Sequence, residues 1–306
     1  MNAVPDKDVI EEVALEMGID PAFVEKDWYV VQLIKEIINI DLFGAQTIFA
    51  GGTALSKAHH LLQRFSEDID FRLIVPENEA TTRSQQRKQL SDIRDCLYKM
   101  ITSHFSPVAV KWKSRDENRY FAFEIEYPSA FESSSALRPH LQVEFTATSL
   151  SFPPIIRPVA SFIAELTGTG AEAAGVVCVD PVENAADKLS ALIWRVPDRV
   201  RIPEDDDPDL ARHIHDLAVL QPYAIGHADF RRLAITTIEQ DGDRCERIKG
   251  MTLNQKANLL LEILTANSDY RTEYIRFVQG MSYAAGGVPT FEEAILKLKT
   301  LIAYLS

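Results

Sequence analysis

No run of apolar residues in this sequence approaches the ~20 residues that a membrane-spanning helix needs. The first residues have neither the basic patch nor the apolar stretch of a secretory signal, so we expect no signal peptide. Cysteine is scarce as well, with only Cys96, Cys178 and Cys245 and no C-x-x-C pair. This usage argues against a zinc site or a disulfide framework. It favours reduced thiols in a cytoplasmic protein that has no membrane partner.

Positive charge is also in short supply. Lys and Arg total 32 and Asp and Glu total 45, so the formal net charge is −13. This balance excludes a broad nucleic-acid coat, which needs clustered cations, but it leaves room for a local basic groove. Two basic stretches are compatible either with RNA contact or with a solvated face: Arg83, Arg87, Lys88 and Arg94, and then Lys111, Lys113, Arg115 and Arg119 with Trp112 and Tyr120 among them.

What the sequence does contain is the composition of a globular protein, with 46% hydrophobic and 25% charged residues. Its length of 306 residues is typical of two domains. The Pro-rich segment 152–158 is the best candidate boundary. We therefore expect a first domain over residues 1–157, with strands and helices, and a mainly helical second domain over 158–306.

Apolar periodicity predicts the elements of both domains. In the first domain we expect helices at 6–17, 21–38, 53–62 and 83–103 and strands at 47–50, 69–75, 108–112, 119–127 and 140–146. In the second we expect helices at 158–167, 181–195, 208–221, 227–239, 252–266, 269–280 and 290–305, with one short strand at 176–179.

A Gly-Gly pair stands between a predicted strand and a predicted helix. Gly51 and Gly52 lack side chains, so a ligand can approach the backbone closely there. The following helix offers free N–H groups and a positive dipole end, both of which favour phosphate. Thr53 can cap this helix and offer a hydroxyl, and Lys57 lies on the same helix face four residues later. The segment fits a phosphate-binding turn and, taken alone, also an ordinary tight turn.

Two aspartates follow this turn closely in the sequence. Asp68 and Asp70 are two residues apart in a predicted strand, so their side chains point to one face, about 6.6 Å apart along the chain. Like charges this close repel each other unless a cation lies between them. Mg²⁺ is usually held by one or two carboxylates together with substrate phosphates. The pair predicts a divalent metal site for Mg²⁺, with Mn²⁺ as the alternative ion. A polar face of an exposed strand is the competing interpretation.

A third carboxylate would complete a two-metal site. Glu144 is the only acid on the polar face of the predicted strand 140–146. Glu124 and Glu126, on the preceding predicted strand, are the rivals for this role. We favour Glu144. With the two aspartates it could hold two Mg²⁺ ions, one at an attacking oxygen and one at a leaving pyrophosphate.

These segments resemble the first two motifs of a known family. The residues read Gly-Gly-Thr-Ala-Leu-Ser-Lys at 51–57 and Arg-Phe-Ser-Glu-Asp-Ile-Asp-Phe at 64–71. Both are similar to motifs of the AbiEii/AbiGii-type toxin nucleotidyltransferases, which belong to the polymerase-β-like nucleotidyltransferase superfamily. The Glu-Lys-Asp-Trp segment at 25–28 is similar to a Glu-Lys-Asp-aromatic segment of the same family. The resemblance implies an α/β (α+β) fold, in which a mixed sheet with flanking helices carries the carboxylates and a helical C-terminal domain closes one side of the cleft.

Two later segments resemble the third and fourth motifs of this family. Asp-Lys-Leu-Ser-Ala-Leu at 187–192 looks like the third motif, whose lysine, here Lys188, is expected to contact a nucleoside triphosphate. Arg-His-Ile-His-Asp-Leu at 212–217 resembles the fourth, usually Arg-Asp-x-x-Asp-Leu. His213 stands where many members have an acid, whereas the second acid, Asp216, is retained.

The resemblance, together with the residue chemistry, assigns expected roles. The expected catalytic residues are Asp68, Asp70, Glu144, Lys188 and Asp216. The expected nucleotide-binding residues are Gly51, Gly52, Thr53, Lys57, Ser66 and Lys188. The expected metal ligands are Asp68, Asp70 and Glu144.

The function that the resemblance implies is a Mg²⁺-dependent nucleotidyltransferase, a toxin of a toxin–antitoxin or abortive-infection system. It would transfer a nucleoside monophosphate from an NTP to the 3′ end of tRNA, release pyrophosphate, and be paired with a separately encoded antitoxin protein. One alternative keeps the chemistry but changes the acceptor to a protein or small-molecule hydroxyl. Another is a non-catalytic nucleotide-binding or protein-interaction module. Retention of the repulsive aspartate pair argues against a module that has lost its catalytic function.

Overall fold

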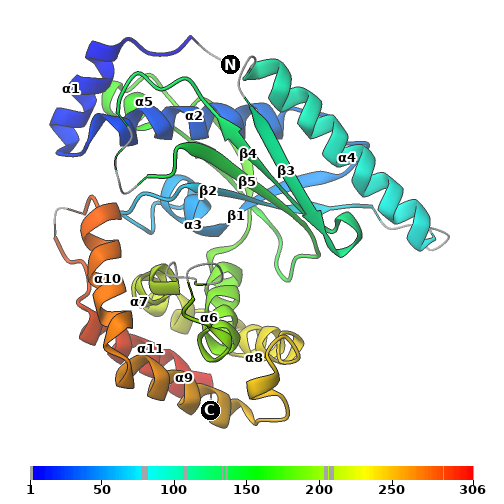
Figure 1. The fold of residues 1–306 in the computed structure, drawn as a ribbon, viewed down its shortest axis with the longest axis vertical. Coiled ribbons are helices and arrows are strands. Elements are labelled where there is room, and N and C mark those ends of the chain that lie inside the picture. The colour runs from blue at the N-terminus through cyan, green and yellow to red at the C-terminus, as the bar shows by residue number, and fades with distance from the viewer. Residues whose placement is uncertain are drawn as a thin grey trace. The chain divides into compact units, whose positions relative to one another are not determined.

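The structure is a computed structural model that describes residues 3–76, 82–105, 109–132, 134, 137–202, 206, 210–284 and 286–305. The chain forms two compact units. The first unit contains Met1–His60 and Phe65–Val179, and the second contains Leu61–Arg64 and Asp180–Ser306. Each unit is described by itself below, with the element labels of Figure 1.

The first unit is built on one mixed sheet. Its strands are β1 (Gln46–Ala50), β2 (Asp68–Ile74), β3 (Val110–Arg115), β4 (Tyr120–Glu126), β5 (His140–Ala147), β6 (Ile155–Val159) and β7 (Ala173–Cys178). Their order across the sheet is β3-β4-β5-β2-β1-β7-β6. Strand β2 lies in the middle, antiparallel to β1 and parallel to β5. The Asp68–Asp70 pair therefore lies on the central strand of the sheet.

Helices cover the apolar face of this sheet. The helical segments of the unit are α1 (Lys7–Met17), α2 (Pro21–Ile38), α3 (Gly51–Thr53), the wider turn η1 (Ala54–Ala58), α4 (Arg83–His104), the short turn η2 (Asp116–Asn118) and α5 (Phe162–Thr167). Asp20 caps α2 through a hydrogen bond to the Ala22 N–H, with Pro21 at the first helical position. Helices α2 and α4 lie along the sheet (Figure 1). Their apolar residues form one buried core with those of the strands. The opposite face carries the polar residues of β2 and β5 together with a small buried cluster of Ile48, Ala50 and Val179.

The second unit is helical. Its elements are α6 (Pro181–Asp198), α7 (Leu210–Gly226), α8 (Phe230–Gln240), η3 (Glu246–Ile248), α9 (Leu253–Ala266), α10 (Ser268–Met281) and α11 (Phe291–Leu305). Asp180 caps α6, and Thr252 with Gln255 forms a capping box at the start of α9. No helix among the described residues is both long enough and apolar enough to cross a membrane.

The expected α/β class, with a mixed sheet and flanking helices, is confirmed. Two local features differ from the expectation. The expected helix 53–62 ends at Ala58. The Pro-rich segment contains strand β6, which lies at the sheet edge, where proline is tolerated because an edge strand leaves N–H positions unpaired. The first residues of the expected strand 108–112 and helix 208–221 lie outside the described part of the chain.

Residues 158–179, which follow the expected boundary, belong to the sheet unit, because they contain β7 and α5. The division between the two units falls at Val179 and Asp180. The expected role of a C-terminal helical domain in closing a cleft stays a prediction.

Candidate active site

The Gly-Gly turn lies directly against one of the two aspartates. Ala50, the last residue of β1, pairs with Asp70 of β2, so Gly51 follows beside that carboxylate. The backbone of Gly51 has φ +74°, and a Cβ atom at this position would lie 1.9 Å from Asp70 Oδ2. Only glycine therefore combines this left-handed conformation with the close approach of the aspartate.

The Thr53 side chain links the turn to the start of β2 by hydrogen bonding. Its buried hydroxyl donates a hydrogen bond to the backbone carbonyl of Asp68, and its Oγ1 lies 3.4 Å from the carbonyl oxygen of Ser66. Gly52 is buried in the same turn, and Ser66 is buried just before the strand. The four residues expected to bind nucleotide at this turn, Gly51, Gly52, Thr53 and Ser66, are thus gathered around the aspartate strand.

Strand pairing places Glu144 beside Asp70. These two residues are direct partners in the parallel β2–β5 register, and Asp68 is opposite Gln142. Directly paired residues on neighbouring strands point to the same face, at a strand spacing of about 4.8 Å. Glu124 pairs with Gln142 from β4, so it is one strand further from the aspartates than Glu144. The register favours Glu144 over its rivals as the third carboxylate, an assignment that stays a prediction.

The carboxylates are held by polar partners from the same face. The Arg138 guanidinium donates a hydrogen bond to Asp68 and lies 3.2 Å from the Gln142 side-chain oxygen. The Gln142 amide in turn donates to Glu144. Burial, with the nearby Glu144 carboxylate as a second cause, raises the pKa of Tyr120. A guanidinium, a side-chain amide and a phenol therefore surround these acids on one face.

This donor set is suited to a hard divalent cation. Asp68 and Asp70 supply oxygen atoms from one rigid strand, which is the arrangement by which Mg²⁺ is shared between carboxylates and substrate phosphates. Among the described residues, no three Asp, Glu, His or Cys side chains are gathered closely enough to hold an ion by themselves. The arrangement therefore fits a cation completed by the phosphates of a bound nucleotide, rather than a preassembled three-carboxylate cage.

Lys57 has a different environment from the one that its helical spacing predicts. Its ammonium lies 3.0 Å from an oxygen of the buried Asp27 and 3.5 Å from Glu165. It also lies 3.9 Å from the centre of the Phe162 ring. The widened turn η1 replaces a regular α-helix here, so the spacing argument from Thr53 no longer sets the direction of the side chain. A contact between Lys57 and nucleotide phosphates stays a prediction.

Asp27 is the buried partner of this lysine. Its carboxylate also accepts a 2.7 Å hydrogen bond from the Phe162 N–H. Burial raises the pKa of Asp27 to about 6, although the positive charge of Lys57 acts in the opposite direction. Through Asp27, the Glu-Lys-Asp-Trp segment thus binds Lys57 in the turn that follows the glycine pair. Its lysine, Lys26, donates to Glu67 and to the Arg138 carbonyl, just before the aspartate strand.

The third and fourth motifs meet within the second unit. Asp216 of α7 is fully buried and accepts two hydrogen bonds from Arg64, at 2.7 and 2.6 Å. The Lys188 ammonium of α6 lies 2.9 Å from the same carboxylate. Burial alone would raise the pKa of Asp216, but Arg64 and Lys188 outweigh it and hold the pKa well below its usual range. Lys188 and Asp216 are brought together in a cluster of two cations and one acid.

His213, the departure from the family pattern, is half-buried in this unit. Its Nδ1 atom has no hydrogen-bond partner among the described residues, and its Nε2 lies 3.4 Å from Arg195. Burial and then the charge of Lys188 hold the pKa of His213 well below its usual range. An uncharged imidazole therefore occupies the place of an acid, beside the cations Lys188 and Arg195.

Sequence reasoning missed two arginines of these clusters. Arg64 begins the Arg-Phe-Ser-x-Asp-Ile-Asp motif and binds Asp216 of the fourth motif. The acid retained in that fourth motif was the sequence signal that a cation should lie beside it. Arg138 carries no motif, and it reaches Asp68 only because the chain before β5 returns to the aspartate strand. No local pattern could have found this second contact.

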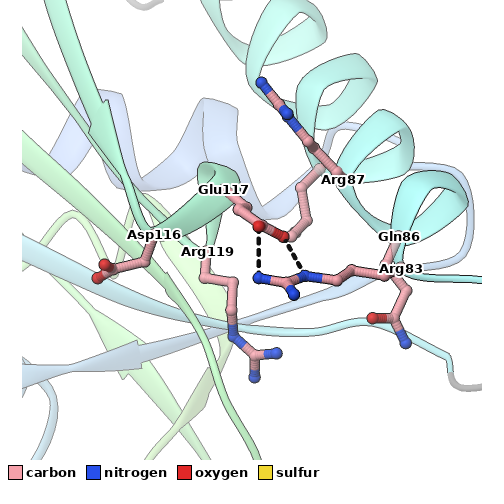
Figure 2. Close-up of a pocket in the computed structure, with 7 residues that line it drawn as sticks. Arg83, Gln86, Arg87, Asp116, Glu117 and Arg119 are labelled. Carbon is pink, nitrogen blue, oxygen red and sulfur yellow. Dashed lines mark hydrogen bonds and ion pairs between the residues drawn. The ribbon is translucent and has the colours of Figure 1, made fainter.

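A cavity of about 560 Å³ lies elsewhere in the first unit, between the start of α4 and the turn after β3 (Figure 2). Three arginines line it, with Arg83 bound to Glu117 through two hydrogen bonds of 2.8 and 2.5 Å. None of the predicted site residues is among those that line this cavity. The cavity is therefore separate from the glycine turn and the carboxylate face, where the candidate active site is predicted.

A mixed sheet that presents an Asp-x-Asp pair behind a glycine turn is the arrangement expected of a nucleotidyltransferase. A family model described as "Nucleotidyl transferase AbiEii toxin, Type IV TA system" matches residues 32–296. The chain belongs to this AbiEii family, and it is thus a nucleotidyltransferase toxin of a type IV toxin–antitoxin system. That class implies an NTP substrate and an antitoxin partner.

The structure is similar to MenT4, a nucleotidyltransferase toxin from Mycobacterium tuberculosis H37Rv. The match has a TM-score of 0.57 at 17% sequence identity, and it covers 98% of this chain and 89% of that chain. At 17% sequence identity, this similarity shows that the two proteins share a fold. No curated protein matches the sequence closely enough to count as a relative.

Proposed function

We propose that the enzyme transfers a nucleoside monophosphate from an NTP to the 3′ end of tRNA, in the cytoplasm, and thereby arrests growth, including during abortive infection. The observation that carries this proposal is the placement of Gly51 against Asp70, with Glu144 paired beside it. This places an approachable backbone turn next to oxygen anions on a rigid strand. Phosphate binding and metal-assisted transfer need these two features at one place.

In the proposed reaction, the 3′-hydroxyl oxygen of the acceptor attacks the α-phosphorus of the NTP. A new oxygen–phosphorus bond forms, the bond to the bridging oxygen of the β-phosphate breaks, and pyrophosphate leaves with the electron pair. The N–H groups of the turn at Gly52 and Thr53 would hold the β- and γ-phosphates, with Lys188 and Lys57 as further phosphate contacts. Catalysis rests mainly on alignment and on charge neutralisation.

Asp68 and Asp70 would hold the divalent cation, Mg²⁺ or in its place Mn²⁺, with Glu144 as the third ligand. When bound, the cation supplies neutralisation of the phosphate charge. Glu144 would also accept the proton of the attacking hydroxyl, since it is the acid paired beside Asp70. Asp216 would position Lys188, whose ammonium it binds at 2.9 Å.

Nucleotide transfer to tRNA with Asp70→Asn as the variant tests this function. Purified protein, Mg²⁺ and each α-³²P-labelled NTP would be incubated with total tRNA. We expect label in tRNA with the wild type and at least a hundredfold less with Asp70→Asn, because the amide removes a charged oxygen ligand. Asp95→Asn, which changes an exposed acid of α4, is the matched control and should retain transfer.

The same experiment separates the alternative acceptors. Label that appears in protein or in a small molecule, and not in tRNA, would replace the tRNA acceptor with a protein or small-molecule hydroxyl. Nucleotide binding without transfer to any acceptor in cell extract would instead support a non-catalytic module. Equal transfer by wild type and Asp70→Asn would refute the carboxylate site.

A further inference from the structure

Three cations of the edge strand β3 point to the same face of the sheet as the carboxylates. Strand pairing makes this explicit through three rows of residues, each running from β3 across β4 and β5 to β2. The rows are Lys111–Glu124–Gln142–Asp68, Lys113–Ala122–Glu144–Asp70 and Arg115–Tyr120–Thr146–Arg72. Since paired residues share a face, the cations and the carboxylates are on one surface.

The middle row links the two groups most directly. Between Lys113 and Glu144 stands Ala122, whose small side chain leaves no bulky group in the row. Two strand spacings of about 4.8 Å separate β3 from β5, so the backbone of Lys113 is about 10 Å from that of Glu144. This distance suits a chain of phosphates whose end reaches the carboxylates.

The cations are available to a ligand. Lys111, Lys113 and Arg115 are all exposed, and β3 contains no acidic residue. In the described part of the chain, neither lysine ammonium forms an ion pair within 4.0 Å. The nearest cross-strand acid is Glu124, opposite Lys111. These three cations, called the basic strip below, therefore keep a net positive charge within a chain of net charge −13.

An aromatic ring accompanies the strip. The Arg115 guanidinium lies 4.1 Å from the centre of the Tyr120 ring, on the carboxylate face. Trp112 belongs to the other face, where Arg94 of α4 lies 4.2 Å from its ring centre. The alternation of β3 thus places Trp112 on the opposite face from Lys111, Lys113 and Arg115, and these three cations join the carboxylate surface.

We infer that Lys111, Lys113 and Arg115 form a binding strip for the phosphodiester backbone of the RNA acceptor, close to the 3′ end that receives the nucleotide. The inference rests on the proposed function, since it assigns the surface that would present the 3′-hydroxyl to the carboxylates. Cations at regular strand spacing, next to an aromatic ring, match the charge and base-stacking demands of single-stranded RNA. A protein hydroxyl carries no such repeated negative charge.

Charged edge strands also have a purely structural use, because lysines discourage edge-to-edge pairing of sheets. That use requires charge on β3 but no contact with RNA. The two explanations differ in what the strip does to RNA affinity and its salt dependence.

Binding of tRNA by a Lys111→Gln/Lys113→Gln/Arg115→Gln variant tests the inference. The measurement would use full-length protein carrying Asp70→Asn, so that no transfer alters the RNA, between about 50 and 200 mM salt. We expect the Kd to rise on the order of tenfold. The slope of log affinity against log salt should fall by about 2, since three phosphate contacts are lost at about 0.7 each. Affinity for the NTP should not change.

The matched control removes three exposed cations of the first unit that lie outside both basic stretches of the sequence. The triple variant Lys7→Gln/Lys99→Gln/Arg157→Gln loses the same charge and should bind tRNA with the parent affinity and slope. Thermal unfolding of each variant shows whether it is folded. The single variant Lys113→Gln, with an expected slope change of about 0.7, serves if the strip triple is unfolded.

The outcomes separate this inference from the proposed function. A strip-dependent loss of RNA affinity supports the binding strip even if the wild type transfers nucleotide to another acceptor, in which case only the proposed function fails. Equal losses from both triples would show a net-charge effect and overturn the inference. Unchanged RNA affinity in the strip variant would leave edge protection as its role and would likewise overturn it.

Discussion

Gly51 combines two constraints that other amino acids cannot meet. Its φ of +74° is a left-handed conformation, and a Cβ atom would collide with Asp70 Oδ2 at 1.9 Å. Replacement by alanine must therefore shift either the turn or the carboxylate. Misplacement of a reacting group by about 1 Å can cost a hundredfold in rate.

We predict that Gly51→Ala lowers nucleotide transfer by about a hundredfold or more. It should also cost about 1–3 kcal/mol in the free energy of unfolding, because an L-residue is held in a left-handed conformation. Gly168→Ala is the control, since Gly168 has φ +66° but open space at its Cβ position. Transfer and denaturant unfolding would be measured on both. Equal loss of transfer in the two variants would show that strain, and not displacement of Asp70, is the cause.

The same residues show what local sequence can predict. The spacing of Asp68 and Asp70 predicts a shared face because the period of a strand is two, and strand β2 has this period. The spacing of Thr53 and Lys57 predicts a shared helix face, but the widened turn changes the period there. Lys57 instead binds the distant Asp27, and no spacing rule could have indicated this partner.

At the scale of elements, the Lys57–Asp27 pair joins the turn η1 to helix α2. Both side chains are buried, and the Phe162 N–H donates to the same carboxylate at 2.7 Å. Removing one partner of a buried pair leaves an uncompensated charge, at a cost of about 3–5 kcal/mol. The pair is therefore the structural support behind the glycine turn.

We predict that Lys57→Met destabilises the protein by about 3–5 kcal/mol at pH 7. The loss should be smaller at pH 5. Burial already raises the pKa of Asp27 to about 6 in the folded protein, above its ordinary value, and removal of Lys57 raises it further. The folded variant therefore takes up a proton as pH falls from 7 to 5, and the penalty shrinks by about 1 kcal/mol. Urea unfolding at both pH values would measure this change.

The double variant Asp27→Asn/Lys57→Met is the control for this charge argument. The amide oxygen can still accept from the Phe162 N–H, but it carries no charge to bury. The double variant should be more stable than Lys57→Met at pH 7 and should lose the pH dependence. If both variants are equally unstable at both pH values, the lysine stabilises through packing on the Phe162 ring rather than through its charge.

Strand β6 shows a second limit of sequence reasoning at this scale. Its residues include Pro158, which is typical of a linker, and their pairing with β7 depends on the position of β7 in the sheet. An edge position is a property of the complete sheet order, which no local pattern contains. Helices with strong apolar periodicity, such as α2 and α11, were predicted to within a residue or two because their pattern is local.

At the scale of the whole molecule, the motifs predicted the family because each is short and specific. The sequence did not predict which motif residues contact one another in the folded chain. Arg64 belongs by sequence to the aspartate motif, yet it belongs by structure to the second unit, where it binds Asp216. A linear motif can therefore supply residues to two different structural units, and only the folded chain shows which residue serves which.

Membership of a toxin family predicts the behaviour of the protein in cells. We predict that production of the wild-type chain without its antitoxin arrests growth, whereas Asp70→Asn allows growth at the rate of an empty vector. Asp95→Asn changes an exposed acid of α4 and should remain toxic, which controls for the loss of one negative charge. Growth curves and protein levels of the three strains would be compared. Arrest by Asp70→Asn at equal protein level would mean that toxicity arises from binding and not from nucleotide transfer, because the variant keeps the fold and the basic strip but lacks the charged oxygen beside Gly51.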